Sequence, residues 1–491
     1  MGDGSKAARR KSTAHTVGRI SNPSYGSFNR GEPPKSHETA TDSNMANVSP
    51  PDGLLAPLDT SRDGAWTVRD AAHLLGRARF GYSPTELDRA TNGGLSETIE
   101  RLLTSQRESA EFQQAETALR KTALATGEIA DLKIWWLYRM WSSANPLAEK
   151  VALFWHTHFA TSNDKVRSVA QMLAQNELIR AQGLGDFKQL LHGMSRDTAM
   201  LVWLDGNANR KRHPNENFAR EIMELFALGV GNYTEKDIQE AARAFSGWHV
   251  REGTFWFNRS QHDDSPKTVF GKTGKFDGTA IVDLCLAQPA CARFLAMKLL
   301  KTFVCPEPTP AQIDVVATRI RLHDFAMTPV LRELFSSQMF FDAAHRRSVI
   351  KSPLDLVVGS LRSLAATVKW PPVARLLANL GQDVFEPPSV KGWEGGRLWI
   401  NSSSILLRTN FATDLASGEQ IATLLKSIID GAGGTSESVV ARLDKLLLGG
   451  TADDGLRAEL VAHHKQADGN ATQQLRSLLQ LTLSLPEYQL H

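Results

Sequence analysis

From Trp66 onward, apolar residues recur at helical spacing, and several of these stretches begin with residues that cap helices. In each case a Ser or Thr is followed three residues later by an acidic residue, which is the spacing of a capping box. The pairs are Thr67 with Asp70, Ser83 with Glu86, and Thr234 with Asp237. Helical patterns continue almost to the C-terminus, so the sequence predicts a mainly α-helical protein.

The helical periodicity is interrupted near residues 248–270. Trp248–Arg251 and Thr254–Phe257 flank a Glu252-Gly253 turn, which is typical of a small β-hairpin. Lys267–Phe270 is a candidate for a further strand, and residues 381–411 are expected to be irregular. The expected fold is therefore a large helical domain with a small β-hairpin insertion near 248–270.

Residues 1–60 are rich in Ser, Gly, Pro, Asn and charged residues, and they contain too little apolar surface to bury in a core. We interpret them as a disordered tail, with Met45 as an alternative start to Met1, and residues 61–491 as a single large helical domain. Residues 1–50 hold seven Lys and Arg against four Asp and Glu, a surplus of three that equals the whole chain's net charge of +3. The rest of the chain is close to neutral, so no nucleic-acid partner is expected.

Three classes of protein are disfavoured by what the sequence lacks. No run of 18 apolar residues occurs, so no membrane span is expected. The basic residues 9–11 are not followed by an apolar segment, so no secretory signal is recognised and we expect a cytoplasmic protein. The three cysteines, Cys285, Cys291 and Cys305, lack CxxC spacing, which favours buried thiols over a disulfide framework or a structural zinc site.

The predicted helix 215–228 carries the most informative group of polar residues. At 100° per residue, Asn217, Glu221 and Glu224 fall within about 60° of arc, beside the apolar stripe of the same helix. Two carboxylates at such a seam need a partner when they are buried. A divalent metal, an arginine such as Arg243, or a histidine would supply it. The alternative is a structural polar network that carries out no chemistry.

Two histidines lie on the predicted helix 149–159. His158 falls on the apolar face, whereas His156 points about 160° away, on the side of Glu149. The two rings can bind one metal together only if the helix ends early. His156 and His158 are therefore weak metal candidates, and core histidines are the alternative.

A third group lies in the loop that follows the predicted hairpin, where His262 and Asp263 stand close to Lys267. A histidine, a carboxylate and an amine this close together are candidates for acid–base catalysis, and His262 is also a candidate metal ligand. The alternative is a turn stabilised by Asp side chains.

Several segments together resemble the bacterial family known as domain of unknown function 1800 (DUF1800), over roughly residues 66–490. They are His73–Gly81, Trp135–Met140, Glu149–Phe159, Asn215–Phe226, Ala241–Trp248, His262–Lys267 and Gly381–Trp393. The resemblance implies a bacterial protein with a domain rich in helices, and it brings no established activity or catalytic residues. Members of the family are often exported and encoded beside a sulfatase-like protein, which makes such a protein a candidate partner.

Two hypotheses of function follow, and whether the protein is an enzyme stays open between them. In the first, a histidine of the 149–159 helix, Glu221 with Glu224, and His262 with Asp263 converge on one polar pocket that acts as a hydrolase, with a divalent metal as candidate cofactor. In the second, the same residues form buried networks in a non-catalytic scaffold that binds a partner. The Trp-containing stretch 381–411 would then be the candidate contact surface.

Overall fold

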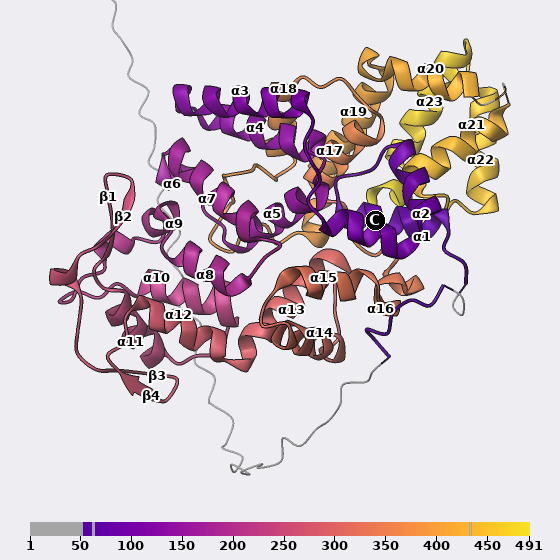
Figure 1. Ribbon diagram of the computed structural model, residues 1–491. Coiled ribbons are helices and arrows are strands. Elements are labelled where there is room, and N and C mark those ends of the chain that lie inside the picture. The colour runs from indigo at the N-terminus through magenta and orange to yellow at the C-terminus, as the bar shows by residue number, and fades with distance from the viewer. Residues whose placement is uncertain (1–52, 61–63, 432, 434) are drawn as a thin grey trace, which may run out of the picture. The chain divides into compact units, whose positions relative to one another are not determined.

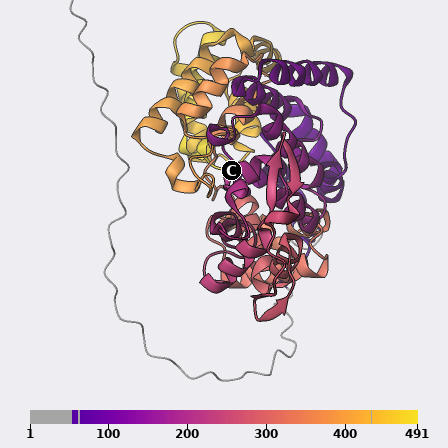
Figure 2. The same ribbon diagram turned by 90° about the vertical axis from the view of Figure 1, so that its left-hand side faces the viewer.

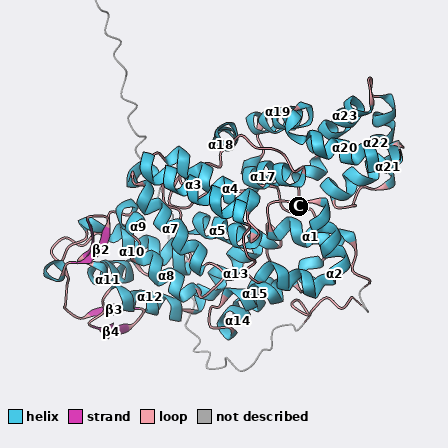
Figure 3. Ribbon diagram, turned by 45° about the horizontal axis from the view of Figure 1, so that its top comes forward, coloured by secondary structure: helices cyan, strands magenta, loops and turns pink. Residues whose placement is uncertain are grey.

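The computed structural model describes residues 53–60, 64–431, 433 and 435–491. Within these residues the regular structure is almost entirely helical, with 23 α-helices and two small two-stranded sheets (Figure 3). The prediction of a mainly α-helical fold is confirmed. Most of the expected tail, residues 1–52 with the alternative start Met45, lies outside the described residues.

The first helices begin where the sequence places capping residues. Thr67 and Ser83 each accept a hydrogen bond from the backbone N–H three residues later, in complete capping boxes. The fifth helix begins at Pro146 and is buried along nearly its whole length, as expected for a helix that is apolar on most sides. These helices are α1 (Val68–Ala78), α2 (Pro84–Leu103), α3 (Ala110–Thr126), α4 (Ile129–Ser142) and α5 (Pro146–His158).

The middle of the chain adds further helices, some of which contact α5 through aromatic side chains such as Phe187 and Phe303. They are α6 (Asn163–Val166), α7 (Val169–Gln182), α8 (Phe187–Ser195), α9 (Thr198–Trp203), α10 (Glu216–Glu221), α11 (Glu235–Phe245), α12 (Gly278–Ala287), α13 (Pro289–Phe303), α14 (Pro310–Leu322), α15 (Met327–Phe335) and α16 (Gln338–Phe341). The predicted helix 215–228 differs from expectation. After Glu221 it continues as a π-helix, η2 (Ile222–Leu228), whose wider turns change which side chains share a face.

The interruption near 248–270 contains two hairpins at one end of the fold (Figure 1). β1 (Trp248–Arg251) pairs antiparallel with β2 (Thr254–Phe257), as predicted, and both turn residues have positive φ, as a tight hairpin turn requires. β3 (Lys267–Val269) confirms most of the candidate strand. Its partner β4 (Lys272–Gly274) was not predicted.

The C-terminal helices lie beside α1 and α2, so the two ends of the described chain meet (Figures 1 and 2). At one contact, a Cβ on Gly449, which has φ of +67°, would lie 2.8 Å from the Ala72 Cβ atom, so only glycine allows this approach. The C-terminal elements are α17 (Pro353–Ser363), α18 (Trp370–Asn379), α19 (Ser402–Ser417), α20 (Ala422–Gly431), α21 (Ser436–Leu443), the π-helix η7 (Asp444–Leu448), α22 (Asp454–Gln466), α23 (Ala471–Ser484) and the short 3₁₀-helix η8 (Pro486–Gln489).

Two predicted boundaries move. Residues 53–60 were placed in the tail, but Leu58 donates a backbone hydrogen bond to Ser336 at 2.8 Å, and Gln338 donates one to Ala56 at 2.8 Å. The packed part of the chain therefore begins before residue 61. The irregular stretch expected over 381–411 ends at Asn401, whose side chain caps α19.

No single helix in the described part of the chain is long and apolar enough to cross a membrane. α12 and α13 reach that length and composition only together, and a bend of 74° separates them. All three cysteines are buried and free, as predicted.

Candidate functional site

His156 and His158 lie on opposite sides of α5, and each contacts a different backbone partner. His156 Nε2 accepts a hydrogen bond from the Phe385 N–H at 3.1 Å, whereas His158 Nε2 lies 3.0 Å from the Phe226 carbonyl oxygen. Burial lowers the pKa of His156 to about 3 and that of His158 well below its usual value, so both rings are neutral. The structure therefore does not bring these two rings together.

His262 and Asp263 are buried where the loop after β2 returns to the end of α11. His262 Nδ1 lies 2.9 Å from the Ser246 carbonyl oxygen, and Asp263 accepts a hydrogen bond from Arg243 Nε at 2.8 Å. The Lys267 amine donates to the Asp263 backbone carbonyl. Burial raises the pKa of Asp263, but hydrogen bonds, led by that from Arg243, outweigh it and hold the pKa well below its usual range. Asp263 is thus a firmly ionised, fully bonded carboxylate.

Glu221 and Glu224 are half-buried at the junction of α10 and η2. The Tyr233 hydroxyl donates to Glu224. Glu221 has no hydrogen bond or ion pair among the described residues, and its pKa is raised, first by burial and then by the charge of Glu224. Glu221 therefore lacks the cation that the sequence predicted as its partner. Arg243, the arginine considered for that role, bonds Asp263 instead.

The predicted site residues have different hydrogen-bond partners. No hydrogen bond or ion pair between described residues joins His262 or Asp263 to Glu221 or Glu224. The described part of the chain also contains no group of three or more His, Cys, Asp or Glu side chains arranged to hold a metal ion.

Glu221→Gln is expected to leave the free energy of unfolding within about 0.5 kcal/mol of the wild type. The folded state already disfavours the charge of Glu221, so removing it breaks no ion pair. Chemical denaturation measures this, with Glu216→Gln as control because Glu216 forms an exposed ion pair with Arg220 at 3.1 Å. A loss of several kcal/mol for Glu221→Gln alone would mean that a buried cation pairs with it.

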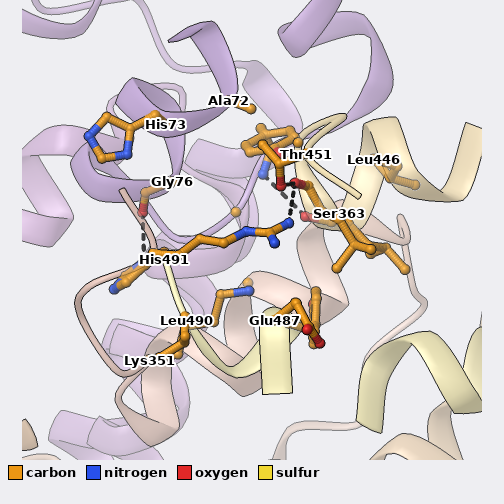
Figure 4. Close-up of a pocket in the computed structure, with 18 of the residues that line it drawn as sticks. Ala72, His73, Gly76, Lys351, Ser363, Leu446, Thr451, Glu487, Leu490 and His491 are labelled. Atoms are coloured by element: carbon orange, nitrogen blue, oxygen red, sulfur yellow. Dashed lines mark hydrogen bonds between the residues drawn. The ribbon is translucent and has the colours of Figure 1, made fainter. Parts of the chain in front are cut away.

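A different group of residues surrounds a cavity of about 100 Å³ between the first and last parts of the described chain (Figure 4). One wall is formed by α17 and the residues just before it. Residues four apart share a face of a helix, and those on this face are Lys351, Asp355, Gly359 and Ser363. Further walls come from α1, η7 and the C-terminal residues 487–491. We call this cavity the basic pocket.

The turn after α1 fits closely against the α17 wall. Gly81 has φ of +64°, and a Cβ there would lie 2.5 Å from the Gly359 carbonyl oxygen and 2.7 Å from the Ser363 hydroxyl. Any larger residue at position 81 would push the two walls apart. Figure 4 shows His73 and Gly76 of α1 on one side of the cavity and Lys351 and Glu487 on another.

The lining of the basic pocket is rich in positive charge. Two of its arginines have carboxylate partners, because Arg79 pairs with Glu86 and Arg346 pairs with Asp70. Asp355 is likewise paired, with Lys150 from α5. Three lining cations have no ion pair with any described residue: Arg69, Arg347 and Lys351. Among the lining carboxylates, Glu487 alone has no ion pair with a described residue. The pocket therefore carries an uncompensated positive charge.

Arg347 is held in an unusual backbone conformation. Its φ is +51°, in the left-handed region that residues with a side chain rarely occupy. Its guanidinium uses one N–H to bond the Leu448 carbonyl oxygen at 3.0 Å, and its other N–H groups have no partner among the described residues. A strained backbone that aims an unsatisfied guanidinium at a cavity is typical of binding sites.

Lys351 is half-buried, and its amine forms no hydrogen bond within the described chain. The Nζ atom lies 3.7 Å from the centre of the Tyr488 ring. Burial is the main cause that lowers the pKa of Lys351 to about 7, with the charges of Arg347 and Arg408 acting in the same direction and Asp355 opposing them. Lys351 therefore exchanges its proton near neutral pH.

No pattern in the sequence singles out Arg69, Arg347 or Lys351. The segment His73–Gly81 was noted only for its resemblance to a family, although it forms part of a pocket wall. The sequence does show that four lining residues recur every four positions from Lys351 to Ser363, which predicts that they share one helix face. It does not show which other segments of the chain lie opposite that face.

The family model described as "Protein of unknown function (DUF1800)" matches residues 73–490, which include Arg347, Lys351 and the C-terminal wall except His491. No curated protein and no solved structure matches the chain. Since the family match covers nearly all the described residues, the chain belongs to the DUF1800 family of proteins of unknown function.

Proposed function

We propose that the basic pocket binds a small molecule that carries a carboxylate or a phosphate group. The observation that carries this proposal is the convergence of Arg69, Arg347 and Lys351 on one cavity without an ion pair to any described residue. Arg347 and Lys351 are partly shielded from water, and a partly buried cation without a counter-ion is stabilised when a ligand supplies an oxyanion. Arginine is well suited to the task, because its planar group can bond two oxygens at once.

The size of the cavity limits the ligand. About 100 Å³ holds several water molecules, since each needs roughly 10–15 Å³. A phosphate ion or a short keto acid fits this space. Glu487, the remaining unpaired carboxylate, gives the pocket one hydrogen-bond acceptor for a ligand hydroxyl.

Arg347→Gln is expected to weaken the binding of inorganic phosphate or pyruvate by about tenfold or more, because hydrogen bonds to a charged group contribute about 1.5–3 kcal/mol. Isothermal titration calorimetry at low salt measures this. The control is Arg321→Gln, because Arg321 also donates only to backbone carbonyls, those of Ala287 and Gln288, but lies outside the pocket.

The affinity for selenate, whose charge does not change near neutral pH, should also fall as the pH rises through about 7, where Lys351 loses its proton. Anions that bind the Arg347→Gln and wild-type proteins equally well would contradict the proposal. So would the absence of any binding by the wild type.

A second candidate is acid–base catalysis at Glu221 and Glu224, which would make the protein a hydrolase. The raised pKa of Glu221 beside Glu224, which is bonded to Tyr233, favours it, because a carboxyl group with a pKa above its usual value is a better general acid. Hydrolysis of model esters and phosphate esters that Glu221→Gln abolishes and Glu216→Gln leaves intact would support it. If neither anion binding nor hydrolysis is found, a non-catalytic scaffold is favoured.

A further inference from the structure

We propose that Lys351 forms an imine with a small aldehyde or ketone whose carboxylate or phosphate group is held by Arg347. This inference rests on the proposed anion site and goes beyond it, because it assigns a covalent step to one atom, the Lys351 Nζ.

The position of the Lys351 amine sets it apart from other buried lysines. The amine of Lys150 is committed to Asp355, and that of Lys267 donates to the backbone carbonyls of Asp263 and Ser265. The amine of Lys351 instead faces the cavity, with the Tyr488 ring on one side and no hydrogen-bond acceptor among the described residues.

Imine formation needs a neutral amine, and the surroundings of Lys351 supply it. The charged groups around the amine are Asp355 on α17, Arg347 on its own segment and Arg408 on α19. Burial and the two arginines bring the pKa of Lys351 to about 7, so about half of the amine is neutral at pH 7. An ordinary lysine, with a pKa near 10.4, is less than about 0.1% neutral there. Enzymes activate Schiff-base lysines by this combination of burial and neighbouring positive charge.

The step balances without an oxidant or a reductant. The Nζ lone pair attacks the carbonyl carbon to form a C–N bond, and the carbonyl oxygen leaves as water after proton transfers. Glu487 lines the same cavity and has no ion pair among the described residues, so we assign it to carry those protons. The protonated imine is again a cation, so the face of the Tyr488 ring and the carboxylate of Asp355 stabilise it as they would the ammonium group.

The test is reductive trapping on the full-length protein. The protein is incubated at pH 7 with pyruvate and cyanoborohydride, and the modified lysines are located by peptide mass spectrometry. We expect labelling of Lys351 at least about tenfold above that of any other lysine, because of its larger neutral fraction. Lys298 is the matched internal control, because burial also lowers its pKa, to about 8, and its amine lies 5.2 Å from the Phe294 ring, yet it does not line the pocket.

Three further measurements separate the imine from the anion site. Labelling of Lys351 should rise between pH 6 and pH 8 while the affinity for selenate, whose charge is constant over this range, falls. Phosphate should compete with pyruvate, and acetone, which lacks an anionic group, should label Lys351 far less than pyruvate does. Lys351→Arg should abolish the preferred label, and Lys298→Arg should leave it unchanged.

Each outcome decides one part of the proposal. If phosphate binds through Arg347 but Lys351 is labelled no more than Lys298, the imine is wrong and the anion site stands. If Lys351 is labelled preferentially but Arg347→Gln and phosphate leave the labelling unchanged, the anion site is wrong. Because the wild-type labelling pattern alone answers the first question, a variant that fails to fold does not hide the result.

Discussion

Glu149→Gln is expected to lower the free energy of unfolding by about 3–5 kcal/mol, the usual cost of leaving buried charges without their partner. Glu149 is only 1% exposed and accepts hydrogen bonds from Trp136 Nε1 at 3.0 Å, Arg139 Nε at 3.0 Å and Arg180 Nε at 2.9 Å. The neutral amide would keep the shape but leave two arginines uncompensated. Denaturant midpoints measure the loss, and Glu216→Gln is the control.

The same carboxylate makes stability depend on pH. Burial raises the pKa of Glu149, but the charges of Arg180 and Arg139 outweigh it and hold the pKa below its usual range. Because the folded pKa is depressed, the stabilisation is complete above the unfolded pKa of about 4.3 and is lost as the pH falls through the folded pKa. The wild type should therefore lose stability in acid more steeply than Glu149→Gln. Equal midpoints for the two proteins at pH 7 would show that the network contributes nothing.

Lys150→Met is the second change expected to cost about 3–5 kcal/mol, because it leaves Asp355 buried without its main partner. Burial raises the pKa of Asp355, but Lys150, His491 and the Ser352 hydroxyl hold it below its usual range. The freed carboxylate would also act on Lys351, raise the pKa of its amine and slow imine formation at pH 7.

A double-mutant cycle with Asp355→Asn measures the coupling between Lys150 and Asp355 directly. An exposed pair serves as the control, because Lys165 and Asp205 lie 2.8 Å apart with side chains 40% and 49% exposed and should contribute under about 1 kcal/mol. A coupling of the same small size in both cycles would contradict the assignment of Lys150 and Asp355 as a buried structural pair.

The sequence predicts elements whose cause is local. Thr67, Ser83 and Thr234 cap helices within three residues of themselves, and Glu252-Gly253 closes a hairpin between its nearest neighbours, so these predictions are confirmed. The π-helix from Ile222 was missed, because residues that suit it also suit an α-helix and no capping or breaking residue marks the change.

The basic pocket could not be predicted in the same way. Arg69, Arg347 and Glu487 come from three distant parts of the chain, and each alone is typical of a solvated surface. For Glu221 and Glu224, the sequence predicted the position of the carboxylates but not their partners. Helical spacing placed the two carboxylates correctly beside each other but did not determine which cation faces them, and Arg243 bonds Asp263 instead.

The binding of an oxyanion between Arg347 and Lys351 is the central claim, and crystals soaked in sodium selenate test it most directly. Selenium scatters anomalously, so its position can be read without assumptions about the protein. We expect an anomalous selenium peak inside the basic pocket, with selenate oxygens at about 2.7–3.2 Å from the nitrogens of the Arg347 guanidinium, and no such peak in Arg347→Gln crystals. Selenate found only at exposed surface residues, with the pocket unoccupied at the same concentration, would contradict the claim.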